Sequence, residues 1–248
     1  MKYMCFLAFL LFSIIWGRGV LFLKKHGISR KISMWLMRYV MKPLSNIEDV
    51  LLNTYYNGVG LIGIIVFTLI LNIPIFKLFT ISSYNLKYII IAPLAVLSFA
   101  NVIITLISPI FKSGKMTEAM MNVPWINFTS TVNPKIGPLI PCVGALLEEI
   151  FFRGVVFYYS YYICDFSFFL ALLFSMLLFG IQQGVFTTSI TQFLLMFCGA
   201  IIVTTISSTV MMLSGSIIPA LLSHEIFIIF YFSKMGFEYK ASTTNRGM

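Results

Sequence analysis

Residues 137–162 read GPLIPCVGALLEEIFFRGVVFYYSYY, an apolar run with charged residues at its centre. A helix needs about 20 apolar residues to cross the hydrocarbon core of a bilayer, so this run is long enough to span one. Glu148, Glu149 and Arg153 would then lie near mid-depth. Each ionisable residue there costs about 2.5–3.5 kcal/mol on insertion scales, so such residues persist when they are paired or functional. The run predicts a membrane helix that carries a buried polar site.

The composition of the whole chain supports a membrane protein. Of the 248 residues, 59% are hydrophobic and 10% are charged, whereas a soluble domain has about 25% charged residues. Lipid is therefore expected to be the solvent for most of the surface. The net charge is +9, but the Lys and Arg residues lie between apolar runs. This pattern is typical of charges that orient a membrane protein, and we expect no nucleic-acid partner.

The distribution of apolar runs predicts an all-α, polytopic transmembrane helix bundle of about seven spans, with a range of six to eight. The fifth and seventh runs are short and are interrupted by polar residues, so their ends are the least defined. The seven runs are Met4–Leu23, Gly58–Phe79, Tyr88–Phe111, Gly137–Tyr162, Phe166–Gln183, Ser189–Leu213 and Ser216–Phe232.

The basic residues between these runs predict the orientation of the bundle. With seven spans, twelve Lys and Arg residues fall on one side, and only Lys2, Lys77 and Lys87 fall on the other. An excess of basic residues marks the cytoplasmic side. We therefore expect a multi-pass protein of the plasma membrane with its N-terminus outside and its C-terminus in the cytoplasm. The twelve are Lys24, Lys25, Arg30, Lys31, Arg38, Lys42, Lys112, Lys115, Lys135, Lys234, Lys240 and Arg246.

The less apolar stretch from Ile28 to Tyr56 follows the first span. On a helical wheel Lys31, Arg38 and Lys42 share a stripe beside an apolar face. This pattern predicts an amphipathic helix at the cytoplasmic interface. A helix packed on the ends of the bundle explains it equally well.

The chain is expected to form one membrane domain with three parts. These are N-terminal membrane helices with a basic cytoplasmic loop (1–136), core helices (137–233) and a short cytoplasmic tail (234–248). The four cysteines, which are far apart, suggest neither a disulfide framework nor a zinc site. They are Cys5, Cys142, Cys164 and Cys198.

The central charges of residues 137–162 differ in their expected partners. Glu149 and Arg153 are four residues apart, the spacing of an ion pair on one helix face. Glu148 lies about 100° around the helix and would face elsewhere. A buried carboxylate of this kind suits a general base that activates water. The alternative is that all three residues form an internal network that braces the helices.

Two further polar pairs fall within the apolar runs. Gln182 and Gln183 end the fifth run, and His224 and Glu225 lie midway along the seventh. A lone buried His is more often a packed, hydrogen-bonded residue than a functional one. Beside a second acid at membrane depth, the structural and functional interpretations of His224 are evenly balanced.

Three segments resemble motifs of one family, the CPBP intramembrane peptidases, which comprise CAAX proteases and bacterial Abi proteins. Residues 147–154, LEEIFFRG, resemble the EExxxR motif. Residues 175–183, SMLLFGIQQ, resemble FxxxH, with Phe179 in place and Gln183 at the His position. Residues 215–224, GSIIPALLSH, resemble the approach to HxxxN, with Ile228 at the Asn position. The order and spacing agree from Pro138 to Phe232.

The resemblance implies a set of roles for these residues. Glu148 would be the base, Arg153 would brace Glu149, and His224 would orient the site or act as its electrophile. Two positions depart from the pattern, because Gln183 cannot take up a proton and Ile228 offers no hydrogen bond. Phe179, Gln183 and Glu225 are possible partners at the site.

The resemblance does not imply a certain cofactor. A divalent metal held by Glu148 and His224 is weakly supported, since zinc usually takes His or Cys ligands. No HExxH pattern is present.

Two functions of different classes follow from the resemblance. The first is a CPBP-type intramembrane endopeptidase that hydrolyses peptide bonds of membrane-associated substrates. The second is a catalytically degenerate relative that binds a membrane partner, either to regulate it or to confer immunity to a bacteriocin. The expected partners are the lipid bilayer and a membrane-associated peptide or protein, and the family's Abi members suggest a bacterial source. A transporter is supported only by the buried charges.

Overall fold

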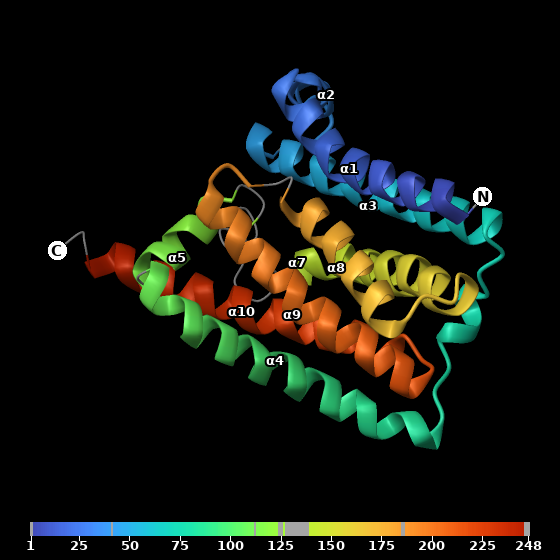
Figure 1. Cartoon of the computed structure of the whole chain (residues 1–248). Helices are drawn as coiled ribbons and strands as arrows, with labels where there is room; N and C mark the ends of the chain where they lie inside the picture. Colours follow the sequence, from blue (N-terminus) through green and yellow to red (C-terminus); the bar gives the residue numbers. More distant parts are fainter. Residues whose placement is uncertain are drawn as a thin grey trace.

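Helices form the whole secondary structure of the described residues in the computed structural model, with no strand among them. Those residues are 2–40, 42–111, 113–123, 126, 139–184 and 187–245. The predicted all-α bundle is therefore confirmed (Figure 1). The elements are α1 (Lys2–Lys25), α2 (Ile28–Leu36), α3 (Leu44–Ile70), η1 (Ile75–Leu78), α4 (Ser83–Phe111), α5 (Ser113–Met121), α7 (Ile140–Glu149), η3 (Ile150–Phe157), η4 (Tyr159–Ile163), α8 (Phe168–Gly184), α9 (Ile190–Ser214) and α10 (Ile218–Asn245).

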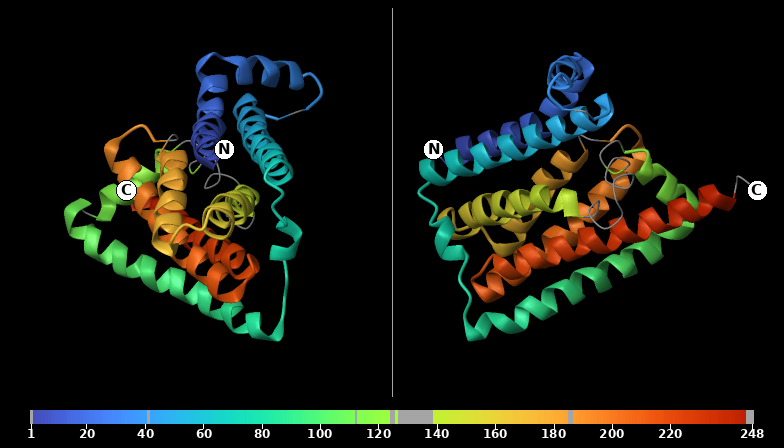
Figure 2. Two further views of the ribbon diagram at one scale, coloured as in Figure 1. Left: turned by 45° about the vertical axis from the view of Figure 1, so that its right-hand side comes forward. Right: turned by 180° about the vertical axis from the view of Figure 1, so that it is seen from behind.

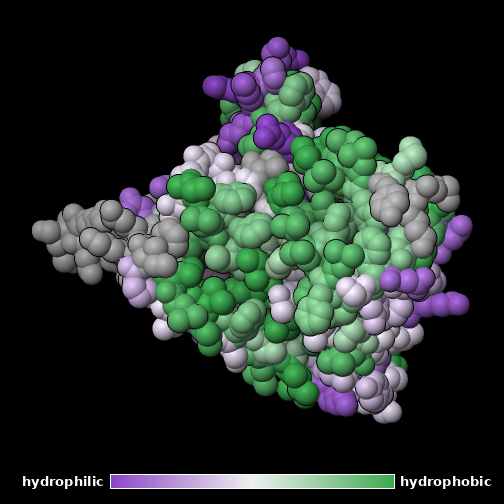
Figure 3. Space-filling model, viewed as in Figure 1, coloured by the Kyte–Doolittle hydropathy of each residue, from purple (hydrophilic) through white to green (hydrophobic). Residues whose placement is uncertain are grey.

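Four of these helices are long and apolar enough to cross a membrane, namely α1, α3, α4 and α9. Shorter apolar helices occupy Phe168–Gly184 and Ile218–Tyr231. Large apolar side chains such as Ile62, Leu69 and Leu94 are exposed on the outside of the bundle. Figure 3 shows these apolar surfaces over the helices, with hydrophilic residues gathered toward the ends. The chain is a multi-pass membrane protein.

The long helices run alongside one another, and the bundle has two distinct ends. The helix α1 begins at one end, and α10 finishes at the other (Figures 1 and 2). Two distinct ends are compatible with the predicted orientation. Which end faces the cytoplasm stays a prediction. Lys112, Lys135, Gly137 and Arg246, on which parts of that prediction depend, lie outside the described residues.

The second predicted span has different boundaries in the structure. It begins at Leu44 rather than Gly58 and ends at Ile70 rather than Phe79. Asn72 adopts a positive φ of 51°, a left-handed conformation that Asn tolerates and that ends a helix. The polar residues before Gly58 remain helical because several of them face the interior of the bundle, as shown below.

The predicted interfacial helix is shorter than expected. The helix α2 ends at Leu36, so Arg38 and Lys42 lie beyond it and do not continue its face. Its buried side packs against α3, where Ser29 Oγ donates a hydrogen bond of 2.5 Å to Glu48 Oε1. Figure 2 shows α2 lying across the ends of α1 and α3. The helix α2 therefore packs on the end of the bundle. Its contact with the membrane interface stays a prediction.

Small residues allow α1 and α3 to approach closely. A Cβ on Gly60 would lie 2.3 Å from the Trp16 ring, which is fully buried. We expect Gly60→Ala to destabilise the protein by about 1–3 kcal/mol, since overpacking outweighs the better helix propensity of Ala. The control is Gly58→Ala, which meets no atom within 4 Å and should leave the protein equally or more stable. Thermal unfolding in detergent measures both, and equal melting temperatures would contradict this packing argument.

Candidate active site

The first motif lies where an α-helix turns into a π-helix. Glu148 and Glu149 are the last residues of α7, and η3 begins at Ile150. A π-helical segment widens the turn, and such segments occur often at functional sites. Glu149 and Arg153 are fully buried, and Glu148 is 7% exposed. The two carboxylates therefore stand in different surroundings although they are adjacent in the chain.

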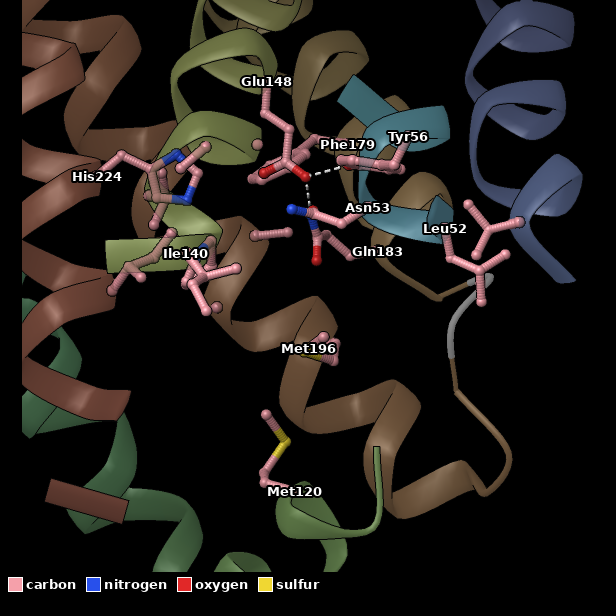
Figure 4. Close-up of a pocket in the computed structure, with 18 of the residues that line it drawn as sticks. Leu52, Asn53, Tyr56, Met120, Ile140, Glu148, Phe179, Gln183, Met196 and His224 are labelled. Carbon is pink, nitrogen blue, oxygen red and sulfur yellow. Dashed lines mark hydrogen bonds between the residues drawn. The ribbon is translucent and has the colours of Figure 1, made fainter. Parts of the chain in front are cut away.

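Glu148 is held by a closed ring of side-chain hydrogen bonds. Tyr56 OH and Gln183 Nε2 both donate to Glu148 Oε1, the latter over 2.9 Å. Gln183 Nε2 also donates to Gln182 Oε1 over 3.0 Å, and Gln182 Nε2 donates to the Tyr56 hydroxyl oxygen. Figure 4 shows Glu148 between Tyr56 and Gln183. Gln183 therefore points at the glutamate rather than away from it.

Glu149 belongs to a second, fully buried group. Its Oε2 lies 3.3 Å from Arg153 Nε, as the spacing predicts, and its Oε1 lies 2.9 Å from His224 Nδ1. Both are close contacts that do not align as hydrogen bonds. Arg153 Nη2 donates to Thr204 Oγ1 over 2.9 Å. Arg153 and His224 thus partner Glu149, which leaves Glu148 to the ring of Gln and Tyr side chains.

Phe179 packs against the group around Glu149. The Arg153 guanidinium carbon lies 4.8 Å from the centre of the Phe179 ring, which places a cation over an aromatic face. The His224 ring meets the Phe179 ring at 75° with 5.9 Å between their centres. The residues of all three motifs therefore meet at one place in the bundle.

A cavity of about 270 Å³ opens beside these residues. Glu148, Phe179, Gln183 and His224 line it (Figure 4). Most of its other lining is apolar, and it includes Met196 and Leu52. A mainly apolar hollow with a few convergent polar groups is the usual form of a small binding site. Glu148 reaches this cavity, whereas Glu149 is fully enclosed.

The remaining predicted partners lie at the edges of the site. Ile228 lines the cavity and contributes an apolar surface where the motif has Asn. Glu225 is directed toward Cys142 of α7, with which it shares a hydrogen bond. The structure therefore gives Glu225 a partner of its own, and it does not stand in for the missing Asn.

No group of three or more His, Cys, Asp or Glu side chains suited to a metal ion occurs among the described residues. The two candidate ligands, Glu148 and His224, each face other protein groups. His224 Nδ1 contacts Glu149, and Glu148 Oε1 accepts from amides and a phenol.

Tyr56, Gln182 and Thr204 take part in the site and were not assigned to it from the sequence. Tyr56 is 92 residues away from Glu148 along the chain, so no local spacing could have linked them. The available sequence signal for such site residues is a polar residue within a long apolar helix. That signal points to Gln182, but it does not distinguish Tyr56 or Thr204.

Residues 134–230 match the family model described as type II CAAX prenyl endopeptidase Rce1-like. This match confirms the resemblance to the CAAX proteases of the CPBP family over the segment that carries the three motifs. No curated protein and no solved structure matches the chain.

Proposed function

We propose, from the match of residues 134–230 to the Rce1-like type II CAAX prenyl endopeptidases, that the chain is an intramembrane endopeptidase. It hydrolyses peptide bonds of membrane-associated substrates, and Glu148 activates the water. The observation that carries this assignment is the contrast between the two adjacent acids. Glu148 lines the cavity, whereas Glu149 is enclosed between Arg153 and His224.

The hydrogen bonds to Glu148 suit it to the role of base. Within the described residues, those bonds end on Oε1 and none involves Oε2. Oε2 is thus the oxygen that can take a proton from a water in the cavity. The hydroxide oxygen then adds to the carbonyl carbon of the peptide. The proton passes from Glu148 to the departing amine nitrogen as the C–N bond breaks, which restores the carboxylate.

His224 is suited to bind the oxyanion that forms on the carbonyl. Its Nδ1 faces Glu149, so Nε2 is the ring nitrogen left for the cavity, and it donates to the oxyanion when both ring nitrogens carry a proton. The Glu149 carboxylate behind the imidazole helps to fix the orientation of the ring. One such donor to an oxyanion is worth about 10²–10³ in kcat.

Gln183 lowers the efficiency of this site because its amide cannot exchange a proton with water. We expect Gln183→His to raise kcat by at least about tenfold, since proton transfer by a positioned side chain contributes 10²–10⁴-fold. Cleavage of a fluorogenic peptide by the purified protein in liposomes measures the gain. The control is the same substitution combined with Glu148→Gln, which should show no gain. An unchanged or lower kcat in Gln183→His would count against the assignment.

A second function is favoured by the same two positions. Gln183 is a neutral hydrogen-bond partner of Glu148, and Ile228 makes the cavity wall more apolar. Both features suit a site that holds a membrane peptide without cutting it, in a regulator or a bacteriocin-immunity protein. In that case the cellular phenotype should survive Glu148→Gln, whereas a protease loses it.

A further inference from the structure

One face of α3 forms a wall of the cavity. Asp49, Leu52, Asn53 and Tyr56 all line it, and they follow the i, i+3, i+4, i+7 spacing of a single helix face. These residues lie outside residues 134–230, the segment that matches the family. The N-terminal half of the chain therefore completes a site whose recognised motifs are all in the C-terminal half.

Tyr56 is the residue of this face that reaches Glu148. Its own backbone is anchored by α1, because Trp16 Nε1 donates to the Tyr56 carbonyl oxygen over 2.8 Å. The two rings also stack, with 5.0 Å between their centres and 26° between their planes. Trp16 is fully buried, so the phenol is held by a rigid neighbour. Its hydroxyl donates to Glu148 Oε1 and accepts from Gln182 Nε2.

We propose that Tyr56 is a positioning residue that orients Glu148 from the N-terminal half of the chain. This inference rests on the proposed function. Gln182 and Gln183 come from one helical turn of α8, whereas the Tyr56 phenol is a donor to Glu148 that α3 and α1 hold. The phenol keeps Oε1 in the ring and directs Oε2 to the cavity. Tyr56 transfers no proton in the reaction, since Glu148 both takes the proton from water and returns it to the amine.

Tyr56→Phe removes only the hydroxyl and tests this assignment. We expect kcat for a fluorogenic peptide to fall about 10- to 100-fold with KM nearly unchanged, which corresponds to the loss of a hydrogen bond to a charged group. The matched control is Tyr55→Phe, since the Tyr55 hydroxyl lies against Gly19 of α1. That variant should keep the kcat of the unmodified protein. In the Gln183→His background, the loss caused by Tyr56→Phe should be smaller.

A second readout separates this inference from the proposed function. The infrared carboxyl band of Glu148, identified as the difference between the protein and its Glu148→Gln variant, should shift in Tyr56→Phe and not in Tyr55→Phe. If the unmodified protein cleaves no peptide but the band shifts, the endopeptidase assignment fails and the positioning of Glu148 by Tyr56 stands. If cleavage depends on Glu148 but Tyr56→Phe changes neither kcat nor the band, the inference is overturned and the endopeptidase stands. A fall in kcat with no band shift would assign Tyr56 a merely structural role and also overturn it.

Discussion

Glu148→Gln is expected to lower kcat for peptide hydrolysis by about 10²–10⁴-fold while the protein stays folded, because a positioned general base contributes that factor. The Gln side chain has nearly the same shape. Its amide oxygen can still accept the hydrogen bonds that Tyr56 and Gln183 donate to Oε1. The ring therefore survives, and only the capacity to take a proton from water is removed.

The measurement compares initial rates of the purified variants in liposomes, with thermal unfolding as the check on folding. Glu225→Gln is the matched control, since Glu225 is also a partly buried acid of the core but pairs with Cys142. It should keep kcat within a small factor. Equal rates for Glu148→Gln and the unmodified protein would remove Glu148 from the mechanism.

Arg153→Met is expected to cause the largest loss of stability, about 3–5 kcal/mol in the free energy of unfolding. Arg153 and Glu149 are both fully buried and lie 3.3 Å apart. Removal of the cation leaves the buried Glu149 carboxylate with His224 as its remaining partner in these contacts. It also removes the donor to Thr204 Oγ1 and the cation over the Phe179 ring.

Combining Arg153→Met with Glu149→Gln should recover much of that stability, since replacing both charges of a buried pair is often nearly neutral. Thermal unfolding in detergent, followed by circular dichroism, gives the comparison. Lys87→Met serves as the control for losing a cation, because Lys87 is exposed and lies over Tyr84 and Tyr88. If Arg153→Met melts at the temperature of Lys87→Met, the buried pair does not stabilise the fold.

The parts of the site that follow from local spacing could be predicted from the sequence. The Glu149–Arg153 contact is one of them, because residues four apart share a helix face. The helical segment that runs from Ile140 to Ile163 is another, because an apolar run of that length matches a bilayer. Its passage into a π-helix after Glu149 could not be foreseen, since no Pro or Gly marks that step.

The parts that depend on tertiary packing could not be predicted. His224 lines the cavity with Glu148, as expected of a site partner, but the contact of its Nδ1 with Glu149 could not be read from the sequence. Tyr56 reaches Glu148 because α3 starts fourteen residues earlier than expected, at Leu44 rather than Gly58. In this early part of the helix, Leu52 and Asn53 line the cavity beside Tyr56.

The central claim is that water activated by Glu148 attacks the peptide bond directly. Single-turnover cleavage of a membrane peptide in ¹⁸O-labelled water, followed by mass spectrometry of product and protein, tests it most directly. The account predicts one ¹⁸O atom in the new carboxyl group of the product and none in the protein segment that contains Glu148. Label in that segment with unlabelled product would show a covalent acyl intermediate on the glutamate and contradict the account, as would the absence of cleavage.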